Sequence, residues 1–309
     1  MAGSLASARA SLRLPRWQTA ALVTALCLLW GLTYPAVKAA LHDASPLMLA
    51  IAARIVGLAP SLALGLLLGG RFPAGWRFQR TAFILGVCNV AGLAGLINLG
   101  SVHVSSGEAS LIVYAQPLLV ALAARLWLGE SGGPLRVAGL LLGFAGLAVV
   151  LADRIHPGAH PQWLAYAELF GAALCWTIGT LVFKRLPAGA SLIWLTTMQN
   201  IYGALPLLAL APLTERIRLD PTPQLALLLL FLGAIIGPIG WLIWLFLLER
   251  GEASVVSGNV FFVPLVALLA GVVLLGEALH PIIGVGAALI AAGIALVNRS
   301  SEPLADGGR

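Results

Sequence analysis

The second half of the chain repeats the first half at a shift of about 146 residues. Trp30 and Lys38 recur as Trp176 and Lys184, both at a shift of 146. Further matches hold at a shift of 146 or 147, and they pair Ser45, Gly57, Pro60, Pro117, Gly129, Glu130, Gly139 and Gly146 with Ser191, Gly203, Pro206, Pro264, Gly276, Glu277, Gly286 and Gly293. Matches of Leu or Ala would mean little in this chain, whereas matched Trp, Lys, Pro and Glu indicate that a whole unit was duplicated.

The composition is that of a membrane protein. Hydrophobic residues make up 60% of the chain and charged residues 10%, with a mean hydropathy of +0.98. An ordinary soluble domain carries about 25% charged residues. The net charge of +6 does not indicate nucleic-acid binding, because most Arg and Lys residues lie in short connections between apolar runs, where they set the orientation in the bilayer. We therefore expect a lipid bilayer as a partner and no nucleic acid.

Ten segments are long enough to cross the hydrocarbon core, which takes about 20 apolar residues. They cover residues 18–40, 47–69, 81–101, 107–128, 134–152, 162–183, 191–212, 224–248, 253–275 and 280–298. The predicted fold is an all-α membrane protein with ten transmembrane helices. Two five-helix repeats, 17–153 and 162–299, lie between polar tails at 1–16 and 300–309.

The charges predict the orientation of these helices. With a cytoplasmic N-terminus, 13 Lys and Arg residues fall on the inner side and four on the outer side, while Arg54 lies within a span. This positive-inside bias places both termini in the cytoplasm. Because five helices are an odd number, the second repeat is inverted relative to the first. Lys38 should then face outward and Lys184 inward.

Three stretches resemble the EamA family of the drug/metabolite transporter superfamily. They are "LLWGLTYPAVK" in the first predicted helix, "SLIVYAQPLLVALAARLWLGE" in the fourth and "FFVPLVALLAGVVLLGE" in the ninth. The proline followed by Leu-Gly-Glu is the most specific part of the resemblance, which covers residues 18–298. It implies a ten-helix carrier of the bacterial-type inner (plasma) membrane. Such carriers often export amino acids or other small metabolites through a central cavity lined by both halves.

Prolines inside the spans predict helix breaks. Proline removes a backbone donor and clashes with the preceding turn. Within a membrane the freed carbonyl needs a protein or water partner. Pro60, Pro117, Pro206 and Pro264 occur as matched pairs near the middle of their helices. We interpret them as bends around the central cavity, and simple packing kinks are the alternative.

Arg54 is the only basic residue deep in a predicted span. An arginine at the bilayer centre costs at least about 2.5–3.5 kcal/mol, so it needs a reason to be there. One interpretation is an anchor for an anionic group of a substrate, such as a carboxylate. The alternatives are structural pairing and snorkelling to the interface. Its repeat equivalent is Asn200, so the charge occurs once.

Three acids lie in or near the predicted spans. Glu168 is a candidate for proton coupling, for an ion pair with Arg54, or for simple exposure at the interface. Glu130 and Glu277 end the fourth and ninth helices, and we expect them to cap the N-termini of the fifth and tenth helices.

Neutral polar and aromatic residues within the spans are the other candidates for the substrate cavity, because such side chains usually face protein or cavity rather than lipid. They are Trp30, Tyr34, Tyr114, Gln116, Trp176, Gln199, Asn200 and Asn259, with Ser257 beside them. By contrast, Trp76 and Trp163 lie at predicted interfaces and should anchor the protein there.

Small residues predict close helix packing in the fifth and tenth helices. Gly139 and Gly143 form a GxxxG pattern, and Gly284, Ala288 and Ala292 form a similar stripe. These stripes could pack within one chain or form a homodimer. The Cys and His residues show no metal-ligand spacing, so we expect no metal and no cofactor.

Three function classes compete. The duplicated, proline-broken helices favour a secondary carrier of a small-molecule substrate. A channel-like facilitator or a lipid-scrambling protein on the same scaffold is the alternative. A membrane-embedded enzyme is the least favoured class, because away from their ends the spans hold one Glu, one Arg and no clustered His. The sequence contains no P-loop, which excludes direct drive by ATP.

Overall fold

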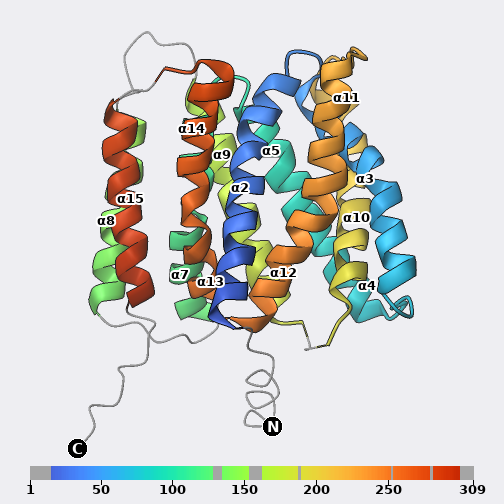
Figure 1. Cartoon of the computed structure of the whole chain (residues 1–309), viewed down its shortest axis with the longest axis horizontal. Coiled ribbons are helices and arrows are strands. Elements are labelled where there is room, and N and C mark those ends of the chain that lie inside the picture. The colour runs from blue at the N-terminus through green and yellow to red at the C-terminus, as the bar shows by residue number, and fades with distance from the viewer. Residues whose placement is uncertain are drawn as a thin grey trace, which may run out of the picture.

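The computed structural model describes residues 15–127, 134–152, 162–186, 189–251, 253–278 and 281–299. Its elements in this part of the chain are helices packed in one bundle (Figure 1). The first half contains α2 (Arg16–Ala40), α3 (Pro46–Leu68), α4 (Trp76–Leu85), η1 (Gly86–Gly92), α5 (Leu93–Gly100), α6 (Ser106–Val113), α7 (Gln116–Trp127) and α8 (Pro134–Ala152). The second half contains α9 (Gln162–Lys184), α10 (Leu192–Thr214), α11 (Pro223–Leu229), η2 (Leu230–Gly240), α12 (Trp241–Arg250), α13 (Ala253–Asn259), η3 (Val260–Phe262), α14 (Val263–Leu275) and α15 (Pro281–Arg299).

The described residues include seven helices that are long and apolar enough to cross a membrane, and two shorter apolar helices. Large apolar side chains cover the outside of the bundle: Leu66 is 74% exposed and Leu67 80%. Such a surface is stable only in lipid. The prediction of an all-α, multi-pass membrane protein is therefore confirmed, whereas the count of ten spans stays a prediction.

Two helices contain a π-helical stretch that the sequence analysis did not predict. They are η1, between α4 and α5, and η2, between α11 and α12. Both stretches are rich in glycine, and η2 also contains Pro238. Wide turns of this kind interrupt the regular backbone ladder and frequently occur at functional sites.

The four candidate prolines fall into two groups. Tyr114 and Ala115 form a turn that separates α6 from α7, directly before Pro117. Pro264 follows the short helix η3 and lies in the first turn of α14. Pro60 and Pro206 instead lie inside α3 and α10, which continue through them.

Two half-buried lysines each bind the end of a helix that lies elsewhere in the chain. The Nζ of Lys38 donates to the carbonyl oxygens of Ser101 (2.9 Å), Val102 (3.2 Å) and Val104 (2.8 Å), after the end of α5. The Nζ of Lys184 donates to the carbonyls of Leu248 (2.8 Å) and Gly251, at the end of α12. In Figure 1, α2 ends at the upper side of the bundle and α12 at the lower side. The two lysines therefore lie at opposite ends.

Two glutamates cap helices of the other half of the chain. The carboxylate of Glu215 accepts from the backbone N–H groups of Leu47 (3.0 Å) and Met48 (2.9 Å) at the start of α3. The carboxylate of Glu277 accepts from the N–H of Ser106 (2.9 Å) at the start of α6. Our prediction that Glu277 caps the tenth helix, α15, is therefore wrong. The carboxylate reaches the free donors of α6 because α14 packs beside it. Glu130 lies outside the described residues.

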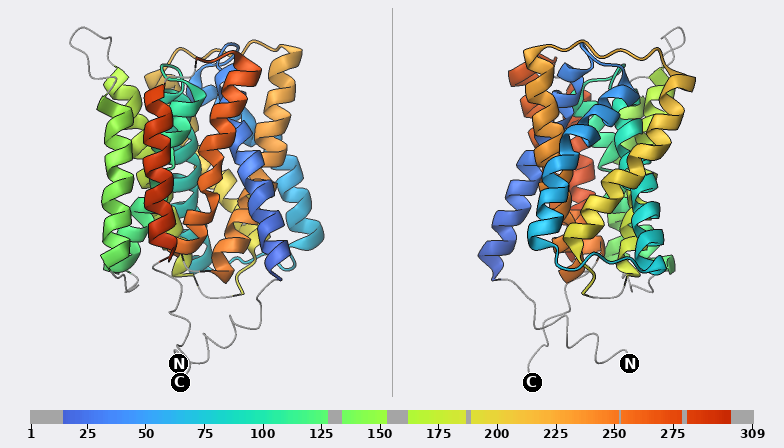
Figure 2. Two further views of the ribbon diagram at one scale, coloured as in Figure 1. Left: turned by 60° about the vertical axis from the view of Figure 1, so that its left-hand side comes forward. Right: turned by 90° about the vertical axis from the view of Figure 1, so that its right-hand side faces the viewer.

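The helices α8 and α15 pack against each other at one edge of the bundle (Figures 1 and 2). Gly143 and Gly139 face Gly293, and Gly146 faces Gly286, so closely that a methyl group on Gly146 or Gly293 would overlap backbone atoms. The GxxxG pattern therefore packs within the chain. Gly284, Ala288 and Ala292 instead lie on the exposed face of α15, so this stripe does not take part in the contact with α8. The homodimer through this stripe stays a prediction.

Candidate functional site

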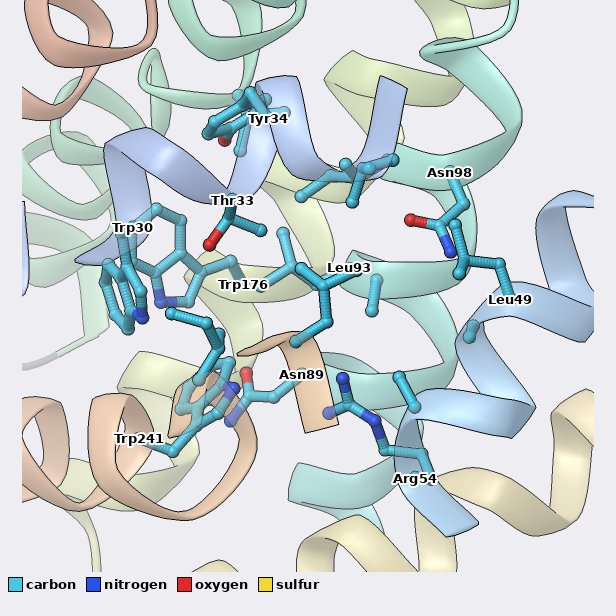
Figure 3. Close-up of a pocket in the computed structure, with 18 of the residues that line it drawn as sticks. Trp30, Thr33, Tyr34, Leu49, Arg54, Asn89, Leu93, Asn98, Trp176 and Trp241 are labelled. Carbon is cyan, nitrogen blue, oxygen red and sulfur yellow. The ribbon is translucent and has the colours of Figure 1, made fainter. Parts of the chain in front are cut away.

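A cavity of about 90 Å³ lies in the centre of the bundle (Figure 3). Its walls come from α2, α3, η1, α5, α6, α9, η2 and α12, so both halves of the chain contribute. The lining residues are Trp30, Thr33, Tyr34, Val37, Leu49, Ala50, Ala53, Arg54, Asn89, Leu93, Ala94, Ile97, Asn98, Val113, Tyr114, Trp176, Leu232, Ile236 and Trp241.

Four tryptophans form one wall of this cavity and the layer behind it. The ring of Trp30 lies 5.2 Å from that of Trp176, 5.7 Å from Trp241 and 5.5 Å from Trp244, measured between centroids. These separations fall in the favourable range for aromatic pairs. Trp30 and Trp176 hold equivalent positions in the two halves and contact each other directly.

Two tyrosines extend the aromatic wall. The ring of Tyr114 lies 5.3 Å from that of Trp176, and the ring of Tyr34 lies 6.4 Å from that of Tyr114. Tyr114 belongs to the turn between α6 and α7, so the helix break brings its ring against the cavity.

Arg54 is the only charged residue among those that line the cavity. Its Nη1 donates to the Oδ1 of Asn200 at 2.9 Å, and its Nε is buried without a hydrogen-bond partner among the described residues. Figure 3 shows the guanidinium pointing toward the side of Asn89. The alternative of an ion pair with Glu168 is wrong, because the guanidinium is held by Asn200 instead.

Arg54 and Asn200 are also equivalent positions of the two halves, 146 residues apart. They contact each other, as Trp30 and Trp176 do. Equivalent positions of the two halves therefore meet beside the cavity at two places.

Two asparagines add hydrogen-bonding groups to the cavity. The Nδ2 of Asn89 donates to the Oε1 of Gln199 at 3.2 Å, and its Oδ1 is buried without a partner among the described residues. The Nδ2 of Asn98 donates to the carbonyl of Pro46 at 3.0 Å. The cavity thus offers one cation and a few amide groups against an aromatic wall.

Five of the predicted cavity residues line the cavity, namely Trp30, Tyr34, Arg54, Tyr114 and Trp176. Gln199 and Asn200 lie behind the lining and hold Asn89 and Arg54. Gln116 is buried beside α9, where its Nε2 donates to Thr180 at 3.2 Å. Glu168 is half-buried on α9 and is not part of the lining. The side chain of Asn259 lies outside the described part of the structure.

The sequence analysis did not name Asn89, Asn98 and Trp241 as cavity residues. The two asparagines lie inside the apolar segment 81–101, and the criterion that singled out Gln199 and Asn200 would have found them. Trp241 is harder to predict as a cavity residue, because it lies in an apolar run that also contains Trp244 and the sequence does not distinguish the two.

The lining of the cavity differs between the two halves of the chain. From Trp30 the lining runs to Val37 and Asn98, near the ends of α2 and α5. In the second half the positions equivalent to Ile97 and Asn98 are Trp244 and Leu245, which are buried and do not line the cavity. The cavity therefore lies closer to the end of α5 than to the equivalent end of α12.

The sequence model of the EamA-like transporter family matches the chain twice, over residues 17–152 and 163–299. The uncharacterized transporter YvbV of Bacillus subtilis is 32% identical over 94% of this chain and 94% of its own length. The probable amino-acid metabolite efflux pump of Escherichia coli is 29% identical over 86% of this chain and 89% of its own.

Two further similarities complete the comparison. The probable terminal-alkyne amino-acid exporter of Streptantibioticus cattleyicolor is 28% identical over 87% of this chain and 90% of its own length. A solved crystal structure, 23% identical, superimposes with a TM-score of 0.70 and covers 94% of this chain and 100% of its own. The helical bundle is thus a fold already seen in another protein.

Proposed function

Because this chain belongs to the EamA-like transporter family, we propose that it is a secondary transporter that exports amino acids or other small metabolites. The observation that carries this proposal is the central cavity. It lies where equivalent residues of the two halves meet, and residues of both halves line it. A binding site between two repeats is the usual arrangement in secondary transporters.

The structural unit of this transporter is a pair of inverted five-helix repeats that together cross the membrane ten times. Reciprocal contacts support this. Lys38 holds the carbonyls of Ser101 and Val104, and the equivalent Lys184 holds those of Leu248 and Gly251, each 147 residues later. The repeats coincide with the two family matches, 17–152 and 163–299.

Glycine contacts repeat in the same reciprocal way. A methyl group on Gly57 would overlap the carbonyl of Gly233, and a methyl group on the equivalent Gly203 would overlap that of Gly86. Gly86 and Gly233 are themselves 147 residues apart. Each repeat therefore packs its second helix against the third helix of the other repeat.

Transport follows from the two equivalent halves. In this state the first repeat is open, and Trp244 and Leu245 close the matching part of the second repeat. When the two repeats exchange these arrangements, the cavity closes at this end and opens at the other end. This exchange is alternating access. With both termini in the cytoplasm of a cell with a plasma membrane, the open end faces outward.

Arg54 supplies the contact for a substrate carboxylate. A guanidinium binds a carboxylate through paired donors, and the lining contains no acidic residue to neutralise it. The aromatic wall accepts an apolar substrate body. Two relatives are named as an amino-acid metabolite efflux pump and an amino-acid exporter, which fits a substrate with a carboxylate.

A metabolite accumulation screen tests this function. Cells with and without the protein are compared for retained and released metabolites, with the proton gradient intact and then collapsed. We expect at least one small carboxylate to be released faster by cells that contain the protein. Equal metabolite pools in both strains under all conditions would overturn the export function.

The aromatic wall provides a second test in reconstituted vesicles. Trp30→Ala and Trp176→Ala should lower transport of the metabolite found in the screen, because each change removes a ring from the cavity wall. Leu66→Ala, on the lipid-facing surface, is the control and should transport like the wild type. Wild-type transport by the double variant Trp30→Ala/Trp176→Ala would show that the cavity is not the substrate site.

The alternative functions differ in their kinetics. A carrier saturates with substrate, whereas a channel-like facilitator conducts ohmically in a planar bilayer. A lipid-scrambling protein moves labelled phospholipids between leaflets at a rate that substrate does not affect. We infer no enzyme activity, since the cavity lining, with one Arg and two Asn, contains no Asp, Glu, His, Cys or Ser residue.

A further inference from the structure

A second, larger hollow lies on the outside of the bundle, at the end where α2 begins. It is a groove of about 630 Å³ between α4 and the last turn of α9, and it shares no lining residue with the central cavity. We call it the basic groove. Its lining residues are Trp76, Arg77, Arg80, Thr81, Ile84, Val182, Arg185 and Leu186.

Helical spacing produces this groove. Arg77, Arg80, Thr81 and Ile84 recur every three or four residues along one face of α4. On the other wall, residues 182, 185 and 186 follow the same spacing at the end of α9. The groove therefore lies between one face of α4 and one face of the end of α9.

All the charged residues that line the basic groove are positive. Three of its eight lining residues are arginines and none is acidic. Within the described part of the chain, no carboxylate forms an ion pair with Arg77 or Arg80, and both side chains are exposed. Glu249, near the same end, is already paired with Arg250. An anion is therefore the ligand that suits this groove.

The groove changes from charged to apolar along the helix axis. Arg77 lies in the first turn of α4 and Ile84 in the last, next to Val182 of α9. Trp76, 75% exposed, lies at the charged end, where an indole favours the membrane interface. An adjoining hollow of about 600 Å³ continues past Phe78 on the other side of Trp76. A free phosphate would use only the charged end of this surface.

We propose that the basic groove binds an anionic phospholipid, with its phosphate on Arg77 and Arg80 and its acyl chains along Ile84 and Val182. Basic pockets between helices at a membrane surface bind such head groups. This binding is distinct from export and does not depend on the identity of the exported metabolite. The lipid stabilises the contact between α4 and α9.

Native mass spectrometry of the full chain, purified in detergent, tests the proposal. The probes are phosphatidylglycerol and phosphatidylcholine with the same acyl chains. We expect the wild type to retain phosphatidylglycerol in preference to phosphatidylcholine. The double variant Arg77→Gln/Arg80→Gln should bind phosphatidylglycerol about thirtyfold more weakly, since each arginine near a membrane surface contributes roughly a fivefold preference.

Matched variants separate the groove from general charge attraction. Arg71→Gln removes an exposed arginine close by in the sequence but outside the lining, and it should keep the lipid. Arg77→Lys/Arg80→Lys preserves the charge and should retain most of the binding. Equal loss in Arg71→Gln, or equal binding of the two lipids by the wild type, would overturn the proposal.

Inorganic phosphate is the third probe and distinguishes a lipid site from a free-anion site. It should leave the phosphatidylglycerol adduct in place at concentrations equal to that of the lipid, because it makes no contact with the apolar part of the groove. Displacement of the lipid by phosphate at equal concentration would assign the groove to a soluble anion instead.

Discussion

Arg54 shows how the cavity can hold a charge inside an apolar bundle. Its guanidinium has one fixed partner, Asn200, and an Nε that no described residue satisfies. A buried donor without a partner costs about 1–3 kcal/mol. In the proposed transporter, a substrate carboxylate in the cavity would give this guanidinium an anionic partner.

The first prediction concerns this arginine. Arg54→Gln should raise the KM for the carboxylate found in the metabolite screen about thirtyfold, because a hydrogen bond to a charged group contributes about 2 kcal/mol. Uptake into vesicles across a range of substrate concentrations measures the change. Arg54→Lys keeps the charge and should lose less. An unchanged KM in Arg54→Gln would remove Arg54 from the substrate site.

The second prediction concerns Lys38, one of the two half-buried lysines. Lys38→Met should lower the thermal stability of the detergent-purified protein by about 2 kcal/mol, since three carbonyls at the end of α5 lose a charged donor. Thermal unfolding followed by tryptophan fluorescence measures it. Arg71→Gln, a charge removal at an exposed position, is the control. Equal midpoints in Lys38→Met and the wild type would show that the lysine does not hold this helix end.

At the scale of helices, the apolar runs predict where helices lie. The segments 18–40 and 47–69 end within a residue or two of α2 and α3, because polar and Gly-rich turns bound them. The runs do not predict how regular each helix is inside. The π-helical stretches η1 and η2 depend on contacts with the other half of the chain, which no local pattern records.

Helix capping shows the same limit. An acid after a helix suggests a cap for the helix that follows in sequence, which is the basis of our expectation for Glu277. In the structure the carboxylate of Glu277 accepts from the N–H of Ser106 at the start of α6 instead. Proximity in space, and not order in the sequence, decides which free N–H groups a carboxylate reaches. Glu215 at α3 is a second case.

The third prediction concerns the contacts between helices of different halves. Gly57→Ala and Gly203→Ala should each destabilise the protein by about 1–3 kcal/mol, because the added methyl overlaps backbone atoms of Gly233 or Gly86. Thermal unfolding of the purified variants measures this loss. The matched control is Gly284→Ala, also within a helix but with open space around it. Similar stability of all three variants would contradict the close approach of these helices.

For the whole molecule, the duplication is readable from the sequence, but the location of the cavity is not. Trp30 and Trp176 stand out as a matched pair, as do Arg54 and its equivalent Asn200. The contact between the two members of each pair can be seen only in the three-dimensional structure. Nor does the sequence indicate that Ile97 and Asn98 line the cavity whereas the equivalent Trp244 and Leu245 do not, because that depends on how the helices pack.

The central claim is that equivalent positions of the two halves face opposite sides of one passage. Asn98 and Leu245 are such a pair, 147 residues apart, with Asn98 in the cavity lining and Leu245 in the closed half. Each is changed to Cys in a chain whose native Cys27, Cys88 and Cys175 are replaced by Ala.

Labelling with a membrane-impermeant maleimide, on intact cells and on inside-out vesicles, is the most direct test. The Asn98→Cys variant should react only from the outside. The Leu245→Cys variant should react only from the inside, and more slowly, because its side is closed in this state. Reaction of both variants from the same side, or of Asn98→Cys from both sides, would contradict the inverted, alternating passage.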